Sequence, residues 1–309
     1  MIYTLTLNPA IDLFITTPQM KEGAVNRTTG ADVQANGKGV NVSFILHRLG
    51  IENQALGIGG GFTLGHIVAE LKRAGIANDF IDAGGITRIN VFTHVSETNE
   101  EFKLVNPGPA VDAAALHQLL ERLDRLGTDD LLILSGSFAQ GIRPEVIVTI
   151  AQLSAQRHFR FVIDTSYPAV LDALQYRPFL IKPNDTELAS WFGEPPSHDT
   201  TARIEMATRL VDRGAQNVLL SCGEDGAIFV GQAGCFVGNA PKIAVLNTAG
   251  AGDTMLGTFV GGWVAGKPVA DNLREAIAAG SDTARRSWLT TFEDLDDLRD
   301  QIVVTREEA

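Results

Sequence analysis

The sequence predicts an α/β fold in which a mostly parallel central sheet is flanked by helices on both faces and carries a small β-sheet lid. Three observations predict this fold. Apolar, β-branched runs of strand length recur along the chain, amphipathic helical patterns alternate with them, and two segments depart from the alternation. Because no low-complexity linker or internal repeat divides the chain, we expect residues 1–309 to form a single domain with lid segments at 13–35 and 86–108.

The alternation places the expected strands and helices in order. Each strand-like run is apolar and ends in polar or glycine residues, which is typical of buried parallel strands. The expected strands lie at residues 2–7, 130–137, 160–166, 178–184 and 217–223. The expected helices lie at residues 41–50, 113–127, 143–157 and 201–214. Ligands bind beyond the carboxyl ends of the strands in such sheets, so the polar ends SGS, DTS, KPND and SCGEDG are expected to line a site.

The lid is predicted from the segments that do not fit the alternation. Residues 88–95 (RINVFTHV) and 100–108 (EEFKLVNPG) resemble a β-hairpin, and residues 13–35 lack a helical period. A small β layer of this kind has unpaired edges and an apolar face, which symmetric pairing with a second copy would cover. We therefore expect a homodimer formed through the lid.

The composition limits the classes of partner. The formal net charge of −12 at pH 7 argues against nucleic acid and anionic membrane surfaces, since both require clustered Lys and Arg. An anionic substrate would have to be held by local positive charge. No segment has the pattern of a secretory signal or a membrane span, so we expect a cytoplasmic protein in which Cys222 and Cys235, the only cysteines, are reduced.

Several common catalytic motifs are absent from the sequence. The glycine-rich stretch GIGGGFTLG (57–65) has neither the dinucleotide-binding nor the Walker spacing, and Gly39 stands after Lys38 where a P-loop would have Ser or Thr. The histidines form no H-x-x-x-H pair, and no G-x-S-x-G elbow occurs. Gly37 and Gly39 would nevertheless allow close backbone approach to a ligand, with Lys38 as a point charge for a phosphate or as a solvated turn lysine.

Two later motifs have both a structural and a functional interpretation. In KPNDTEL (182–188), Asn184 or Asp185 can cap the following helix with Glu187 in its first turn, or Asn184 and Glu187 can hold a hydrated Mg²⁺ ion. In SCGEDGA (221–227), Gly223 and Gly226 can form a hairpin turn or admit a nucleotide.

The stretch LNTAGAGDTMLG (246–257) places three small residues before an aspartate. Asp253 could simply be the N-cap of the apolar helix that follows. The alternative is a catalytic carboxylate at the entrance to a glycine-rich turn, and the order of all the motifs bears on this choice.

The motifs NPAID, GKGVN, TRIN, SGS, DTS, KPNDTE, SCGEDGA and NTAGAGDT follow one another in an order that resembles the ribokinase-like sugar kinases. The resemblance is to the PfkB branch, which phosphorylates sugar phosphates, and it runs from Ile2 to about residue 290. It implies a ribokinase-like fold that binds ATP, Mg²⁺ and a sugar phosphate. It also implies that Asp253 is the general base and that the N–H groups of Gly250, Ala251 and Gly252 stabilise the transferred phosphoryl group.

The resemblance assigns the remaining site residues to two ends of the site. At the nucleotide end it implies Lys182, Asn184, Glu187, Ser221, Gly223, Gly226 and Gly280, with Asn184 and Glu187 reaching the metal through water. At the sugar end it implies Asp12, Arg27, Gly37, Lys38, Gly39, Asn41, Arg88 and Ser137. Asp12 could instead be a turn residue, and Arg27 and Arg88 could be solvated charges on strand edges; Arg27 could also reach across a dimer interface.

The sequence departs from the family pattern at several positions. Asn36 replaces the first of two glycines that usually precede the lysine, Tyr167 stands where glycine is common, and Cys222 stands where leucine is usual. Asn36 and Tyr167 lie near the expected ligand paths and could alter the choice of sugar.

The segments ALGIGGGFTLG and TRINV are most similar to the subgroup that converts fructose 1-phosphate to fructose 1,6-bisphosphate. Tagatose 6-phosphate is the alternative acceptor. A protein of another class, a catalytically silent sugar-phosphate sensor, is a further alternative, against which the intact Gly250, Gly252 and Asp253 argue.

Overall fold

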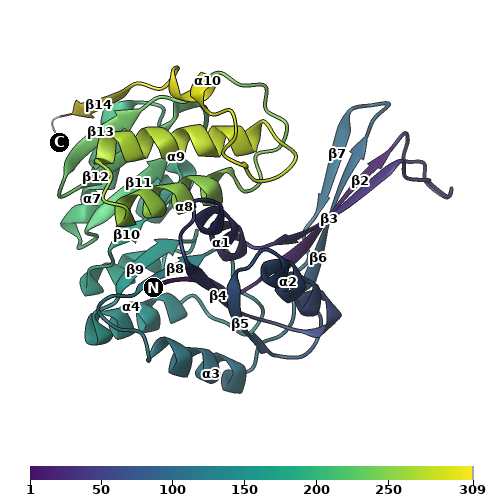
Figure 1. Cartoon of the computed structure of the whole chain (residues 1–309), viewed down its shortest axis with the longest axis horizontal. Helices are drawn as coiled ribbons and strands as arrows, with labels where there is room; N and C mark the ends of the chain where they lie inside the picture. The colour runs from purple at the N-terminus through teal and green to yellow at the C-terminus, as the bar shows by residue number, and fades with distance from the viewer. Residues whose placement is uncertain (308–309) are drawn as a thin grey trace.

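The computed structural model describes residues 1–307 and contains a large sheet, a small sheet and helices on both faces of the large one (Figure 1). The large sheet has the order β14-β13-β12-β11-β10-β9-β8-β1-β4-β5. Its strands are β1 (Ile2–Thr6), β4 (Asn53–Gly59), β5 (Ala77–Asp82), β8 (Leu131–Ser135), β9 (Arg160–Asp164), β10 (Leu180–Ile181), β11 (Asn217–Ser221), β12 (Ala227–Gly231), β13 (Gly234–Gly238) and β14 (Val304–Glu307). The strands from β5 to β11 are parallel, and β12, β13 and β14 extend the sheet in antiparallel fashion. The predicted α/β class with a mostly parallel sheet is confirmed.

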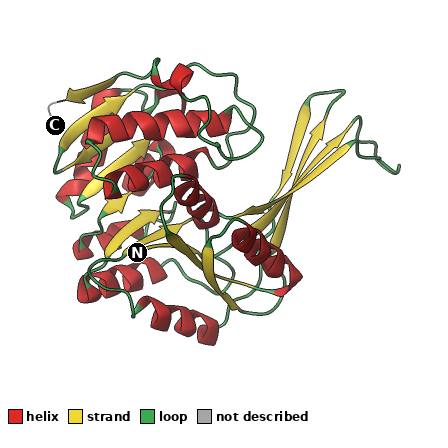
Figure 2. Cartoon of the chain, in the orientation of Figure 1, coloured by secondary structure: helices red, strands yellow, loops and turns green. Residues whose placement is uncertain are grey.

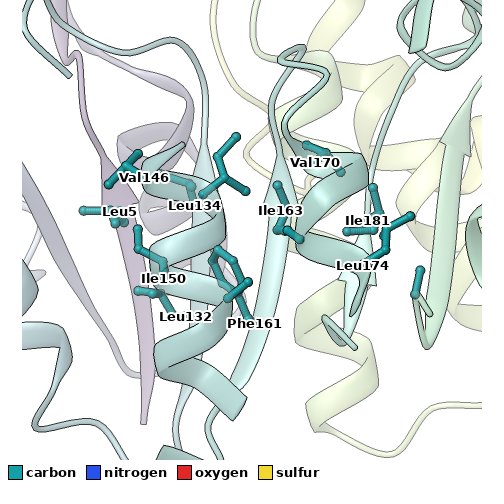
Figure 3. Packing of buried hydrophobic residues seen from close by; sticks show 14 of the residues in the cluster. Leu5, Leu132, Leu134, Val146, Ile150, Phe161, Ile163, Val170, Leu174 and Ile181 are labelled. Atoms are coloured by element: carbon teal, nitrogen blue, oxygen red, sulfur yellow. The ribbon is translucent and has the colours of Figure 1, made fainter. Parts of the chain in front are cut away.

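Alternate residues of the central strands face the two sides of the sheet. Leu132 and Leu134 of β8 belong to one apolar core, while Leu131 and Ile133 belong to the other. This period of two, with both faces buried, explains why the strand runs are apolar throughout. Figure 3 shows Leu134 beside Val146 and Leu132 beside Ile150; Val146 and Ile150 belong to one helix (Val146–Arg157) that covers the first face.

The helices divide between the two faces. They are α1 (Lys38–Arg48), α2 (Gly61–Arg73), α3 (Ala113–Leu123), α4 (Val146–Arg157), α5 (Val170–Ala173), α6 (Asp185–Phe192), α7 (Thr200–Asp212), α8 (Ala251–Val264), α9 (Val269–Ala284) and α10 (Asp296–Arg299), with short 3₁₀ turns η1 (Leu174–Tyr176) and η2 (Gly223–Asp225). Helices α3, α4, α6 and α7 pack on one face, and α1, α8, α9 and α10 pack on the other. Among residues 1–307, none of these helices combines the length and the apolarity that a membrane crossing requires.

The small sheet projects away from the large one as a lid that contains strands and loops only (Figure 2). Its strands, in the order β3-β2-β6-β7, are β3 (Gly30–Asn36), β2 (Ala10–Thr17), β6 (Arg88–Val95) and β7 (Glu100–Leu104). The β2–β3 ladder begins at the Ala10–Asn36 pair, so the lid extends beyond the expected segment 13–35 at both ends. As a result β3 runs directly into the N-terminus of α1.

Candidate active site

The N-terminus of α1 lies against β1, and two glycines make this close approach possible. Gly37 is the N-cap of α1 at φ 130°, a conformation that favours glycine. A Cβ atom at Gly37 would lie 2.8 Å from Thr6 Cγ2, and one at Gly39 would lie 2.9 Å from the carbonyl oxygen of Leu5. Both glycines are therefore required by packing, whether or not they also contact a sugar. This packing places Lys38 and Asn41 beyond the end of the sheet.

Asp253 lies in the first turn of α8 and is not its N-cap. The N-cap is Gly250 at φ 80°, and no side chain caps the helix. The Asp253 carboxylate is only 5% exposed, and its Oδ2 accepts a hydrogen bond of 2.8 Å from Asn41 Nδ2 of α1. The capping interpretation of Asp253 is therefore not what the structure shows. Its carboxylate instead joins two helices that are distant in sequence.

Burial raises the pKa of Asp253 to about 6. The Lys38 ammonium opposes this increase, the nearby Asp164 carboxylate adds to it, and Asn41 and Lys182 also lower the pKa. At pH 7 the group is therefore mostly ionised, yet its pKa is close enough to neutrality for it to accept and return a proton.

The first turn of α8 supplies backbone N–H groups that have no acceptor inside the helix. Gly252 faces Lys182, since a Cβ atom on Gly252 would lie 3.5 Å from Lys182 Nζ. Gly280 of α9 packs on the same turn, where a Cβ atom would lie 3.1 Å from the carbonyl oxygen of Ala251. The turn formed by Gly250, Ala251 and Gly252 thus combines a helix N-terminus with a neighbouring ammonium group, an arrangement suited to an anion.

Asp164 brings two lysines together and was not singled out from the sequence. It is fully buried at the end of β9, and its Oδ1 lies 3.1 Å from Lys182 Nζ and 3.4 Å from Lys38 Nζ. Burial acts to raise the pKa of Asp164, but Lys182 and Lys38 outweigh it and lower the pKa. Its Oδ2 is buried without a hydrogen-bond partner among residues 1–307. In the sequence, the polar DTS segment (164–166) at the end of a predicted strand was the pattern that could have identified Asp164 as a site residue.

Asn184 and Glu187 form the capping box that the sequence allowed. Asn184 Oδ1 accepts from the Glu187 N–H at 2.7 Å, and Glu187 Oε2 accepts from the Asn184 N–H at 2.9 Å. The second oxygen of Glu187 is outside this box. Within the described chain no three acidic, His or Cys side chains gather as a metal cage. The residues therefore fit a Mg²⁺ ion that keeps several waters and takes other ligands from phosphates, rather than one held by protein alone.

The turn after β11 lies beside the start of α6. The Ser221 N–H donates to the carbonyl oxygen of Pro183 at 3.1 Å, and Gly223 and Gly226 lie at the ends of the turn η2. A buried arginine that sequence reasoning missed ties these parts together: Arg203 of α7 donates to Asp185 at 2.9 Å and to Asp225 at 2.8 Å. Its position on the apolar stripe of α7 was the signal that could have revealed it.

Asp12 lies on β2 of the lid and is held by two amides. Its Oδ1 accepts from Asn90 Nδ2 at 2.8 Å and its Oδ2 from Asn36 Nδ2 at 2.6 Å. Burial raises the pKa of Asp12, while these amides and the Arg88 guanidinium lower it. The carboxylate is thus held in the lid with lone pairs available for further donors.

Arg88 lies beside Asp12 and reaches the main domain. Its Nη2 donates to the carbonyl oxygen of Asn8 at 3.1 Å and lies 3.5 Å from Ser137 Oγ. The Tyr167 hydroxyl accepts from the Phe138 N–H at 3.1 Å, on the chain segment next to Ser137. The structure therefore brings Arg88, Ser137 and Asp12 close together, and their assignment to a sugar stays a prediction.

Arg27, in contrast to Lys38 and Arg88, lies far from the other residues predicted to bind the sugar phosphate. It is exposed in the loop between β2 and β3, which lies at the outer end of the lid (Figure 1). The reason is the length of the β2–β3 ladder, which carries this loop away from the main domain. Within one chain, Arg27 is therefore separated from Lys38 and Arg88.

The two buried aspartates predict opposite effects on stability. Asp253 has a raised pKa, so ionisation destabilises the fold as the pH rises from about 4 through about 6. Asp253→Asn should therefore increase the free energy of unfolding by roughly 3 kcal/mol at pH 8, and the gain should vanish at about pH 3, below the pKa of the unfolded chain. Denaturant unfolding of the variant and wild type at both pH values measures this.

Asp164→Asn is the matched control with the opposite sign. Its pKa is lowered, so the ionised form stabilises the fold above pH 4 and this stability is lost as the pH falls through the folded pKa. The variant should therefore be less stable than wild type at pH 8. A loss of stability at pH 8 in the Asp253 variant as well would contradict the raised pKa.

Comparison with known proteins agrees with this geometry. A model of the pfkB family of carbohydrate kinases, whose members use ATP and a divalent metal, matches residues 5–293. The chain is 41% identical to D-tagatose-1-phosphate kinase of Bacillus licheniformis over 305 residues, which cover 99% of each protein. It is 33% identical to 1-phosphofructokinase of Bacillus subtilis over 306 residues, which cover 99% of this chain and 100% of that protein. Phosphofructokinase-2 of Escherichia coli, solved with substrates and products, superposes with a TM-score of 0.89 at 28% identity, covering 97% of this chain and 98% of that one. This chain belongs to the pfkB family of carbohydrate kinases.

Proposed function

We propose that the protein transfers a phosphoryl group from ATP to the free 6-hydroxyl group of a ketohexose 1-phosphate. The observation that carries the proposal is the buried Asp253 carboxylate, which lies at the N-terminus of α8 and is influenced by the Lys38 and Lys182 ammonium groups. A carboxylate that remains ionised at pH 7 in such a site can act as a general base for an attacking hydroxyl. We propose that the protein acts in the cytoplasm.

In the proposed reaction, Asp253 accepts the proton of the sugar hydroxyl while the hydroxyl oxygen attacks the γ-phosphorus of ATP. The bond between that phosphorus and the β–γ bridging oxygen breaks, and ADP leaves. The N–H groups of Gly250, Ala251 and Gly252 then stabilise the charge on the transferred phosphoryl group, as an anion hole. Lys38 and Lys182, held by Asp164, add positive charge beside it. A bound Mg²⁺ ion would neutralise charge on the ATP phosphates.

We assign the nucleotide to the edge formed by the end of β10, the start of α6 and the turn η2. Lys182 would contact the phosphates, and the free oxygen of Glu187, with Asn184 beside it, would bind Mg²⁺ through water. The remaining residues proposed to line this end are Ser221, Gly223, Gly226 and Gly280. Arg203 stabilises this edge, because its ion pairs with Asp185 and Asp225 join the start of α6 to the turn η2.

We assign the sugar phosphate to the space between the lid and the N-terminus of α1. Asn41 Oδ1 is buried and has no partner in the described part of the chain, so it is available to a sugar hydroxyl, as is Asp12. Arg88 and Ser137 are proposed to bind the phosphate of the sugar, whereas Lys38, which Asp164 holds near Asp253, is proposed to contact the reacting end. Short contacts of this kind are needed because the net charge of −12 repels an anion at longer range.

The named relatives favour a 1-phosphate over tagatose 6-phosphate. D-tagatose-1-phosphate kinase and 1-phosphofructokinase both carry the 1-phosphate of a ketohexose in their names. Fructose and tagatose differ only in the configuration of C4, so the two 1-phosphates share the reacting end and the phosphate. The higher identity to the tagatose enzyme makes D-tagatose 1-phosphate the first alternative to fructose 1-phosphate.

The function is tested by ADP release with a panel of acceptors. Fructose 1-phosphate or tagatose 1-phosphate should give the highest kcat/KM, ahead of tagatose 6-phosphate, fructose 6-phosphate and free fructose. Asp253→Asn should lower kcat by about 100-fold or more, the scale of lost general-base catalysis. Preference for a free sugar would overturn the phosphosugar assignment, and binding without any ADP release would support a silent sensor.

Arg88→Ala should raise KM for the sugar phosphate by roughly 10- to 100-fold, since a charge-assisted contact to phosphate is lost. KM for ATP should hardly change, and the turnover of an unphosphorylated sugar should be affected far less. Lys103→Ala removes a lid cation whose Nζ lies 3.2 Å from Glu101 and should leave both KM values unaltered. An unchanged KM in the Arg88 variant would refute its role in phosphate binding.

We also propose that the protein is a homodimer joined through the lid. The paired residues Val33, Leu13, Val91 and Leu104 form an apolar row across all four lid strands, on the face opposite Asp12. Val33 and Leu104 are 51% and 63% exposed, and a second copy would cover them. In such a dimer, Arg27 could reach the partner.

Light scattering should give twice the mass of one chain for the wild type. Leu104→Glu places a charge in the apolar row and should yield monomers, whereas Lys103→Glu on the opposite face should remain dimeric. A monomeric wild type would contradict the proposed interface.

A further inference from the structure

Asn36 connects two carboxylates that belong to different parts of the fold. It is the last residue of β3 in the lid and directly precedes Gly37, the N-cap of α1. Its Nδ2 donates to Asp12 Oδ2 at 2.6 Å, and its Oδ1 accepts from Asn41 Nδ2 at 2.9 Å. Asn41 Nδ2 also donates to Asp253 Oδ2 at 2.8 Å. A continuous chain of hydrogen bonds thus runs from the lid to the carboxylate of α8.

The chemistry of the groups fixes the direction of every bond in this chain. An ionised carboxylate only accepts, so the amide nitrogen of Asn36 must face Asp12. The Asn36 oxygen then faces Asn41 and the Gly37 N–H, which donates to it at 2.6 Å. Asn41 uses both hydrogens of its amide group, one toward Asn36 and one toward Asp253. Its own oxygen therefore points elsewhere, and it is buried without a partner among residues 1–307.

We propose that Asn36 is a positioning residue that couples the sugar-binding carboxylate Asp12 to the general base Asp253 through Asn41. The inference rests on the proposed function, because it assigns sugar binding to Asp12 and base catalysis to Asp253. Without the Asn36 amide, Asn41 would lose the contact that fixes the rotation of its side chain. Its amide group would then be free to turn away from Asp253.

The coupling has a consequence for how the site responds to a sugar. Asp12 belongs to β2 of the lid, whereas Asp253 belongs to α8 of the main domain. A sugar hydroxyl that displaces Asp12 would shift the Asn36 side chain through their hydrogen bond. The shift would reach Asp253 through the Asn41 amide, which is hydrogen-bonded to both Asn36 and Asp253. A glycine at this position would have no side chain to form such a connection.

The ionisation of Asp253 reports on this coupling. Asp253 is faced by Lys38 and Asn41 of α1, Asp164 of β9 and Lys182 after β10. Of these groups, only Asn41 is hydrogen-bonded to Asn36. Loss of Asn36 should therefore change the Asn41 contribution alone, and weaker donation from Asn41 would favour the protonated form of Asp253.

Asn36→Ala and Asn90→Ala form a matched pair for the experiment. Both asparagines donate to Asp12, at 2.6 and 2.8 Å, but only Asn36 also contacts Asn41. Both variants should raise KM for the sugar. Only Asn36→Ala should also lower kcat, by roughly 10-fold, and move the acid limb of the pH profile of kcat upward by roughly one pH unit. The assay uses whichever acceptor the wild type phosphorylates fastest.

A second readout does not depend on activity. NMR titration of ¹³C-labelled aspartate carboxyls, with Asp253→Asn identifying the signal, should show a higher pKa for Asp253 in Asn36→Ala than in Asn90→Ala. Equal values in the two variants, or equal acid limbs, would overturn the coupling while leaving the proposed function intact. If the wild type phosphorylates no sugar, the proposed function fails, and the titration still decides whether Asn36 acts on Asp253.

Discussion

The ion pairs of the buried Asp164 with Lys38 and Lys182 organise the centre of the site. A single carboxylate oxygen lies 3.1 Å from one ammonium group and 3.4 Å from the other, at a position with no exposed surface. An unpaired charge at such depth would be very costly, so the lysines and Asp164 stabilise one another. The two lysines come from different elements, the N-terminus of α1 and the segment after β10. Their convergence defines the place where we propose that phosphates bind, and it determines how much positive charge Asp253 experiences.

The lid is linked to α1 by the covalent path of the chain, and α1 is linked to α8 by the hydrogen bond between Asn41 and Asp253. β3 passes into α1 with only Gly37 between them, and α1 contributes both Lys38 and Asn41. Since the glycines of this junction pack against β1, the junction has little room to adjust. The position of the lid and the orientation of the site groups are therefore not independent variables. Such a connection suits an enzyme that has to enclose its substrate before the base acts.

Much of the site was predictable because parallel strands end at the same edge of a sheet. This argument correctly gathers Lys182, Asn184 and Ser221 at one edge, and the glycine-rich turn identifies Asp253 as the residue to examine. The contact between Asn41 and Asp253, which are 212 positions apart, depends on how α1 packs on α8, and no local pattern reveals it. The roles of those side chains in catalysis and binding remain predictions.

The residues that the sequence did not reveal share a physical cause. Asp164 and Arg203 are charged residues inside apolar segments, and their value depends on partners supplied by other elements. Arg27 is a different case: its motif is similar to that of the family, but a long ladder carries it to the outer end of the lid, away from Lys38 and Arg88 of the same chain. Asn36 could be noted as a departure from the family pattern, but its two contacts could not be foreseen without the lid register. Periodicity locates elements, whereas the pairing of isolated polar side chains is decided by tertiary packing.

The burial of the two cysteines has a consequence for the redox behaviour of the protein. Burial raises the pKa of both thiols, that of Cys222 to about 12, although the Arg203 guanidinium acts in the opposite direction. The thiolate is the form that reacts with oxidants and alkylating reagents, so both side chains are chemically inert in the folded state. Cys222 directly precedes the turn η2 at the nucleotide edge. Its modification therefore requires that edge to open, which makes alkylation kinetics a probe of local unfolding there and of its suppression by bound nucleotide.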